Sequence, residues 1–221
     1  MSHGKDYITS LIAQGEHEHQ DFKYQISDAR KIARSISAFA NNSGGHLLVG
    51  VKDNGHIAGV SSDEEIYMIE QAATMYCQPQ QQVHFKLYRV EGRTVLKVDV
   101  DEADEKPVKA PDDNGRWQTY FRVNDENILA SAVHVKVMEH KSHEDEPPAI
   151  IHYSEREQLL LGYLRTHGGI TLTGFTRLAH ISRNAAELSV VNLCNMGVIT
   201  LQYHNGHCLI TPSPDNNINN P

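Results

Sequence analysis

Three acidic residues in the N-terminal part of the chain could together hold a metal ion. Glu16 and Asp21 are five residues apart, and Asp53 follows the apolar segment 46–52. Carboxylate oxygens are the ligands that Mg²⁺ and Mn²⁺ prefer, and such an ion can direct water against a phosphodiester. Lys23 shares a strand face with Asp21 and could stabilise the charge that develops on the phosphate. The alternative is that Asp53 only begins a tight turn and Glu16 is a solvated loop residue.

The pattern around these residues predicts a mixed α/β domain over residues 1–140. Helices are expected at 5–14, 28–42, 63–77 and 128–139. Strands are expected at 20–25, 46–52, 57–60, 83–90, 94–101 and 117–123. Asp28 is a suitable N-cap for the second helix, and Ser62 with Glu65 forms a capping box for the third. This order would place the three acids at the ends of neighbouring strands.

A second domain is predicted beyond a charged segment that ends in two prolines, residues 141–149, which is typical of a linker. Residues 150–213 show three helices and then a hairpin, at 154–166, 172–179, 183–196, 198–203 and 207–211. Three helices followed by a two-stranded wing is the order of a winged helix, with the third helix in the recognition position. The asparagine-rich residues 214–221 predict a disordered tail. The expected class is therefore α+β.

Five polar residues of the winged-helix domain are candidate nucleic-acid contacts: Arg177, Arg183, Asn184, Tyr203 and His204. Arg183 and Asn184 begin the third helix, where a recognition helix meets DNA. Glu187 on the same helix would repel phosphate, and the helix carries no basic stripe. Since winged helices also serve as dimerisation or docking modules, the sequence leaves that alternative open.

The charge distribution argues against avid, non-specific binding to nucleic acid. The net charge is −8, and residues 1–149 contain 16 Lys and Arg against 24 Asp and Glu, whereas residues 150–221 contain four of each. Clustered Lys and Arg supply most of the affinity for nucleic acid, so any such site must be local.

The remaining composition predicts a cytoplasmic protein without a membrane partner. The N-terminus lacks the apolar core of a signal peptide, the three cysteines are scattered, and no apolar run approaches the roughly 20 residues of a membrane helix. The segment Asn41–Gly45 lacks the Lys-Ser/Thr of a P-loop, so ATP is not an expected cofactor.

Several motifs of the N-terminal half resemble those of a known family. They are Glu16, Asp21-Phe22-Lys23, Ala38-Phe39-Ala40-Asn41, Gly44-Gly45, Gly50-Val51, Asp53, Gly59 and Tyr120-Phe121-Arg122-Val123. In combination they are similar to the Schlafen-type AlbA-like domain over residues 10–135. Two positions depart from the family pattern: Asp21 stands where Glu is usual, and Asn124 stands where Gly follows Arg-Val.

The resemblance implies either binding or catalysis. Bacterial members are usually described as DNA-binding proteins or transcriptional regulators, whereas animal Schlafen members use the domain as a metal-dependent ribonuclease. The three acids of those nucleases map by motif onto Glu16, Asp21 and Asp53, and their paired domains could be supplied here by a homodimer.

We therefore expect a nucleic-acid-binding protein that favours DNA over RNA and acts as a transcriptional regulator. The first alternative is an endoribonuclease that uses Mg²⁺ or Mn²⁺ held by the three carboxylates. The second is a dimerising interaction module without a nucleic-acid role.

Overall fold

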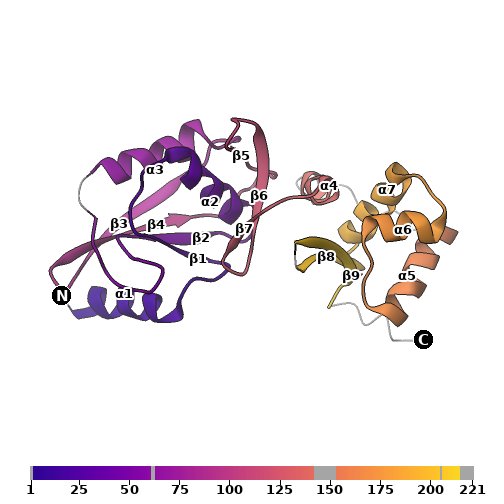
Figure 1. Cartoon of the computed structure of the whole chain (residues 1–221), viewed down its shortest axis with the longest axis horizontal. Helices are drawn as coiled ribbons and strands as arrows, with labels where there is room; N and C mark the ends of the chain where they lie inside the picture. Colours follow the sequence, from indigo (N-terminus) through magenta and orange to yellow (C-terminus); the bar gives the residue numbers. More distant parts are fainter. Residues whose placement is uncertain (1, 61–62, 142–152, 205, 215–221) are drawn as a thin grey trace. The chain divides into compact units, whose positions relative to one another are not determined.

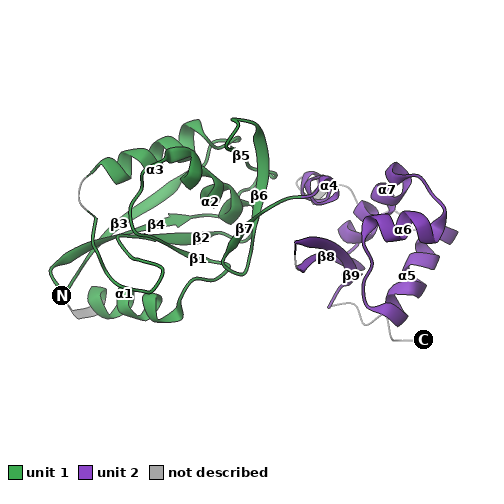
Figure 2. Ribbon diagram, viewed as in Figure 1, with its two compact units in different colours: residues 1–130 green, residues 131–221 purple. Residues whose placement is uncertain are grey.

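The computed structural model describes residues 2–60, 63–141, 153–204 and 206–214. It divides into two compact units, residues 1–130 and 131–221, which are treated separately below (Figure 2). None of the described helices is both long enough and apolar enough to cross a membrane. Most of the predicted linker and tail, and Ser62 of the predicted capping box, lie outside the described residues.

A four-stranded sheet forms the centre of unit 1 (Figure 1). Its strands are, in spatial order, β1 (Gln20–Lys23), β2 (Gly45–Val49), β4 (Arg93–Val100) and β3 (Val83–Val90). β1 and β2 run parallel, with Lys23 opposite Val49, and the other neighbours run antiparallel. β2 is interior because Leu47, Leu48 and Val49 bury apolar side chains on both faces. β1 and β3 are the edge strands.

Helices cover both faces of this sheet (Figure 1). α1 (Ser2–Gln14) packs Ile8 and Leu11 on one face, and α2 (Ala29–Asn41) and α3 (Glu64–Met75) pack on the other. The side chain of Asp28 accepts the N–H of Arg30 at 2.9 Å, which confirms the predicted N-cap of α2.

Two glycines let the end of α2 lie close to the sheet. Gly44 has a φ of +75°, and a Cβ there would lie 2.8 Å from the carbonyl oxygen of Val100. A Cβ at Gly45 would lie 2.3 Å from the ring of Phe39. The chain can therefore leave α2 and enter β2 at once, which sets the start of β2 directly beside the last turn of the helix.

A second, three-stranded antiparallel sheet packs against α2. It consists of β5 (Lys109–Pro111), β6 (Trp117–Val123) and β7 (Glu126–Leu129). The predicted helix at 128–139 is wrong in its first part, because Asn124 adopts a left-handed φ of 55° and Asn124-Asp125 turns the chain back along β6. The predicted strand 57–60 is also wrong, since that segment forms only a single bridge between Val51 and Ile57.

Unit 2 contains four helices and a hairpin among its described residues (Figure 1). They are α4 (Ala132–Lys141), α5 (Glu155–His167), α6 (Leu172–Ala179), α7 (Arg183–Asn195) and the antiparallel pair β8 (Ile199–His204) and β9 (His207–Pro212). Val133 and Val137 of α4 share an apolar core with Val190 of α7. The unit therefore begins at residue 131, not after residue 140 as expected, because α4 buries its apolar face on α7. The predicted α+β class is confirmed.

Candidate functional site

Glu16 lies in a tight turn between α1 and β1. Backbone hydrogen bonds of 3.0 Å join His17 and Gln20 in both directions. The buried side chain of Gln20 donates to the carbonyls of Leu11 and Gly15, which fixes the turn. The Glu16 carboxylate then accepts the N–H of Phe22 at 2.8 Å. Because β1 is an edge strand, this bond satisfies a backbone donor that has no neighbouring strand.

Asp21 meets Glu16 at this edge of the sheet. Asp21 is 4% exposed and accepts Lys23 Nζ at 2.8 Å and Ser35 Oγ at 3.3 Å. Arg122 Nη1 lies 3.6 Å from Asp21 Oδ2. The carboxyl of Glu16 is hydrogen-bonded to the carboxyl of Asp21. We call Glu16, Asp21, Lys23 and Arg122 the acid cluster.

Arg122 places a buried positive charge beneath the two acids. It is 2% exposed, and its guanidinium donates to three backbone carbonyls, those of His17, Gln20 and Asp125. Its Nε atom has no hydrogen-bond partner among the described residues. Burial lowers the pKa of Arg122, while the neighbouring charge of Asp21 opposes that shift. The guanidinium therefore both balances Asp21 and holds the turn that carries Glu16.

Glu16 changes its charge near neutral pH. Burial and the hydrogen bond with Asp21 raise the pKa of Glu16 to about 7. Two carboxyls in contact retain one proton between them because two negative charges at that distance repel each other. Glu16 can therefore exchange a proton at neutral pH or, once ionised, offer an oxygen to a cation.

Asp53 is not part of the acid cluster. It lies in an exposed turn closed by a 3.0 Å bond between Lys52 N–H and the His56 carbonyl. β1 ends at Lys23, opposite the last residue of β2, so the turn carries Asp53 beyond the strand ends. Across the described ranges, no three His, Cys, Asp or Glu side chains are grouped to hold a metal ion. The expected convergence of three carboxylates is not found; Glu16 and Asp21 supply two.

Tyr24 and Lys52, just beyond the carboxyl ends of β1 and β2, form a pair that was not anticipated from the sequence. Tyr24 is 55% exposed, and Lys52 Nζ lies 5.2 Å from the centre of its ring. An exposed aromatic ring beside a cation is a group on which nucleic-acid bases stack. The pairing follows from the parallel register of β1 and β2, which no local pattern reveals.

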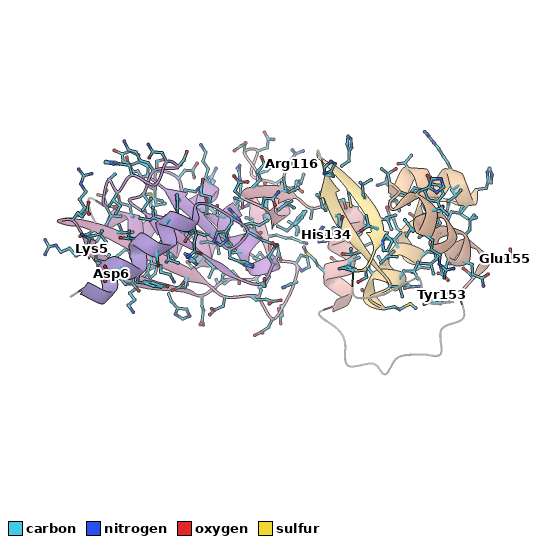
Figure 3. The ribbon with its side chains drawn as sticks, turned by 90° about the horizontal axis from the view of Figure 1, so that it is seen from below. Lys5, Asp6, Arg116, His134, Tyr153 and Glu155 are labelled. Atoms are coloured by element: carbon cyan, nitrogen blue, oxygen red, sulfur yellow. The ribbon has the colours of Figure 1, made fainter. Side chains whose placement is uncertain are left out.

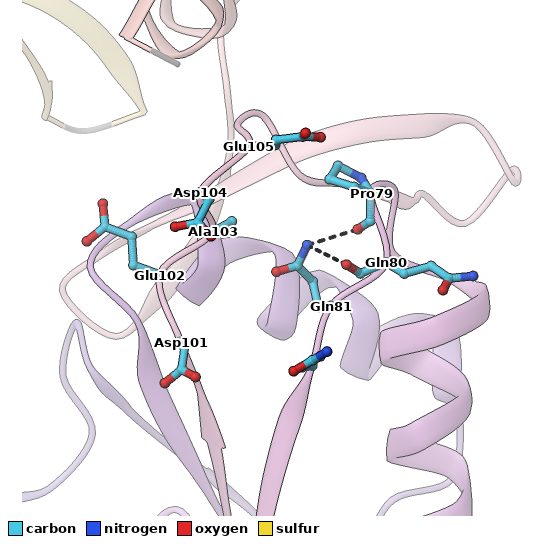
Figure 4. Close-up of a pocket in the computed structure, with 9 residues that line it drawn as sticks. Pro79, Gln80, Gln81, Asp101, Glu102, Ala103, Asp104 and Glu105 are labelled. Atoms are coloured by element: carbon cyan, nitrogen blue, oxygen red, sulfur yellow. Dashed lines mark hydrogen bonds between the residues drawn. The ribbon is translucent and has the colours of Figure 1, made fainter. Parts of the chain in front are cut away.

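The end of the sheet opposite to Tyr24 and Lys52, where Gly45 of β2 lies beside Val100 of β4, is strongly acidic. A cavity of about 380 Å³ there is lined by the carboxylates of Asp101, Glu102, Asp104 and Glu105 (Figure 4). On its opposite side, the side-chain amide of Gln81 is bonded to the carbonyls of Pro79 and Gln80. Four carboxylates repel phosphate, so nucleic acid is not expected to contact this end of unit 1.

In unit 2, the expected repulsion by Glu187 is removed by two cations. The buried Glu187 carboxylate accepts Lys136 Nζ at 2.5 Å and Arg183 Nε at 2.9 Å. These hydrogen bonds, that of Lys136 first, lower the pKa of Glu187. The side chain of Arg183 is still 67% exposed, so it can contact a ligand as well as the carboxylate.

The other candidate contacts of unit 2 divide into two groups. Three of them are exposed: Arg177, Asn184 and His204. Tyr203 instead donates its hydroxyl to Ser131 Oγ at 3.1 Å, accepts the Ser131 N–H, and lies 3.2 Å from His134 Nδ1. His134 projects from α4, as Figure 3 shows. Burial raises the pKa of Tyr203 to about 12. Tyr203 therefore anchors the start of α4, a role that the sequence pattern does not indicate.

Comparison with known proteins identifies the family to which the chain belongs. The model of the family described as Schlafen, AlbA_2 matches residues 16–131, more than half of the chain, and the whole acid cluster lies within that range. The chain belongs to the Schlafen AlbA_2 family. No curated protein matches the chain.

Two solved structures are similar to this Schlafen AlbA_2 chain. The DIP2311 protein of Corynebacterium diphtheriae has a TM-score of 0.48 and 19% identity, over 96% of this chain and 50% of that protein, so the chain spans half its length. The N-terminal domain of a RecG-related protein from Nitrosomonas europaea has a TM-score of 0.38 and 21% identity, over 68% of this chain and 98% of that domain.

Proposed function

We propose that this Schlafen AlbA_2 protein binds DNA and acts as a transcriptional regulator, with unit 2 as a winged-helix docking module. Membership of the family supports a role linked to nucleic acid. The observation that carries the DNA proposal is the join between α6 and α7, a three-residue turn in which His180 has a φ of 51°. Helix–turn–helix motifs with such turns place their second helix in the major groove.

The exposed face of α7 supports this placement. Asn184, Leu188 and Asn192 are exposed and four residues apart, so they lie on one side of the helix. An asparagine amide can bond adenine through two atoms, and leucine offers an apolar contact to the thymine methyl group. Arg177 on α6 and His204 at the end of β8 add groups suited to phosphate.

Duplex binding, followed by fluorescence anisotropy over a series of salt concentrations, tests the proposal. Arg177→Ala should weaken binding to all sequences and reduce the salt slope by about one. Asn184→Ala should change the preference among sequences while the salt slope stays the same. Arg165→Ala is the matched control, because Arg165 is exposed on α5, outside the proposed surface. Absence of duplex binding at low salt would contradict the proposal.

A second function, metal-dependent RNA cleavage, is favoured by the contact between Glu16 and Asp21. These carboxyls would hold Mg²⁺ or Mn²⁺, which would supply a Lewis acid for hydrolysis. Lys23 would bind the substrate phosphate from the same strand face. We rank this function second because Asp21 already accepts Lys23 and Ser35 and lies beside Arg122, and because Asp53 is not in the cluster.

Cleavage of end-labelled structured RNA with Mn²⁺ or with EDTA tests this second function. If Asp21→Asn abolishes cleavage and Asp53→Asn does not, the site uses two acids. If both abolish it, the Asp53 turn must close on the cluster during catalysis. Intact RNA under every condition would contradict the nuclease. A folded protein that neither binds duplex nor cuts RNA would favour the interaction module, in which homodimerisation is the function.

A further inference from the structure

We propose that unit 2 contains a binding site for a phosphate group carried on an apolar or aromatic body. The site is a cavity of about 380 Å³ bounded by the starts of α4, α6 and α7 and by β9. This size lies within the range of roughly 300–1,000 Å³ that is typical of small-ligand sites. The proposal does not rest on the proposed function, because the exposed face of α7 formed by Asn184, Leu188 and Asn192 is not part of the lining.

The cavity has an apolar floor and a polar rim. Val133 and Ile210 are buried and Leu172 is half-buried, and these three side chains come from α4, β9 and α6. Arg183, His207 and Thr173 are exposed and contribute a guanidinium, an imidazole and a hydroxyl. An apolar surface with a few convergent polar groups is the usual design of a site for a small organic molecule.

The charge of the rim selects an anion. None of the residues that line the cavity is acidic. Arg183 of the rim pairs with the carboxylate of Glu187, which also accepts Lys136, so two cations face one anion there. The acidic cavity of unit 1 has the same volume and four carboxylates, so the two cavities should select ligands of opposite charge.

Helix geometry adds to this selection. The first N–H groups of a helix have no partner within their own helix, and they form the positive end of its dipole. Ser131, Thr171 and Ser182 each cap one such N–H, at the starts of α4, α6 and α7. The caps leave further first-turn N–H groups of all three helices without an intrahelical partner. A phosphate at the rim would complement these donors together with Arg183.

A titration of the full-length ¹⁵N-labelled protein with inorganic phosphate and with phenyl phosphate, at constant ionic strength, tests the site by NMR. Both ligands should shift the amide signals of residues 131–133, 171–173 and 207–210. Phenyl phosphate should bind roughly tenfold more tightly, because its ring covers the apolar floor. His207→Ala and Thr173→Val should each weaken both ligands by roughly tenfold or less through loss of one hydrogen bond.

The matched control is His167→Ala. His167 is an exposed histidine at the end of α5 and does not line the cavity, so this variant should bind both phosphates as the wild type does. Arg183→Gln is a less suitable first variant, because it also removes a partner of the buried Glu187. Scattered shifts, or equal losses in His167→Ala and His207→Ala, would overturn the proposal.

A DNA backbone carries the same phosphate chemistry, and a competition experiment separates the two sources. If phenyl phosphate displaces a bound duplex from the wild type, the cavity receives a phosphate of the DNA backbone. If both bind together, the ligand is a free small molecule. Failure of duplex binding alone leaves the phosphate titration unaffected, so the two proposals can fail separately.

Discussion

Each unit contains a glutamate withdrawn from solvent, half-buried at Glu16 and buried at Glu187, and their surroundings shift the two pKa values in opposite directions. In unit 1, Glu16 contacts the carboxyl of Asp21, and its pKa rises to about 7. In unit 2, Glu187 contacts two cations, Lys136 and Arg183, and its pKa falls. Burial raises the pKa in both cases, so the difference comes from the partners.

This difference separates an acid that can react from an acid that holds the structure together. With its pKa raised to about 7, Glu16 can exchange a proton at neutral pH, as general acid–base catalysis requires. Glu187 stays ionised and ties α4 to α7 through Lys136, while its pair with Arg183 lies within α7. Predictions about the two acids can therefore be made with opposite signs.

The largest effect is expected when the buried cation of unit 1 is removed. Arg122→Met should lower the free energy of unfolding by about 3 kcal/mol or more, because Asp21 stays buried with less compensation and three carbonyls lose their donor. Denaturant unfolding measures this loss. Arg116→Met, an exposed arginine paired with Asp112, is the control and should cost at most about 0.5 kcal/mol. Equal losses in both variants would contradict the role of Arg122.

The second effect is a gain in stability of Glu16→Gln over the wild type at high pH, which is expected only if folding raises the pKa of Glu16. The pKa of Glu16 rises from 4.5 to about 7 on folding, so its contribution to stability is complete below pH 4.5 and is lost as the pH rises through 7. Glu16→Gln stays neutral, so it should match the wild type at low pH and be more stable above pH 7. The difference should be about 1–2 kcal/mol, allowing for partial exposure. A pH-independent difference in thermal unfolding would show that Glu16 has an ordinary pKa.

Glu187→Gln should show the opposite pH dependence and a smaller effect. Because the pKa of Glu187 is lowered, its contribution is present above its ordinary value of 4.5 and is lost as the pH falls through the folded-state value. The variant should therefore be less stable than the wild type at pH 7, by about 1 kcal/mol, and approach it in acid. A variant that unfolds like the wild type at pH 7 would mean that the two ion pairs contribute nothing.

The smallest effect is expected for the tyrosine that anchors α4. Tyr203→Phe removes the hydroxyl that bonds Ser131 and lies beside His134, and it should cost about 1 kcal/mol or less. Hydrogen exchange of the first turn of α4 should accelerate while the exchange of unit 1 is unchanged. Unaltered exchange in that turn would remove Tyr203 from the structural role assigned to it.

Local signals in the sequence predicted much of the fold. Asp28 predicted the start of α2, and the segments expected as strands at 83–90, 94–101 and 117–123 match β3, β4 and β6 to within one residue. β7 was missed because Ile128 and Leu129 lie just before the apolar residues of α4 and resemble the first turn of that helix when the preceding turn is ignored. The turn itself was visible, since Asn124-Asp125 is a sequence that accepts a left-handed φ.

The candidate site was harder to predict because its members are held together by tertiary contacts. Glu16, Asp21 and Lys23 are close in sequence and do meet. Arg122, about a hundred residues away, contacts them only because β6 packs beside α2. The position of Asp53 depends on where β1 and β2 end relative to each other, which motif spacing does not specify.

The two glycines between α2 and β2 have a consequence for engineering the chain. Replacing glycine by alanine can stabilise a protein by about 0.4–1 kcal/mol where the backbone and the space allow it, because the unfolded chain becomes less flexible. Gly44 and Gly45 lack the space for a Cβ, so a library of folded variants should retain glycine at both positions. Gly162, within α5, has an ordinary helical backbone and open space where a Cβ would lie, so Gly162→Ala is the better place to begin thermostabilisation.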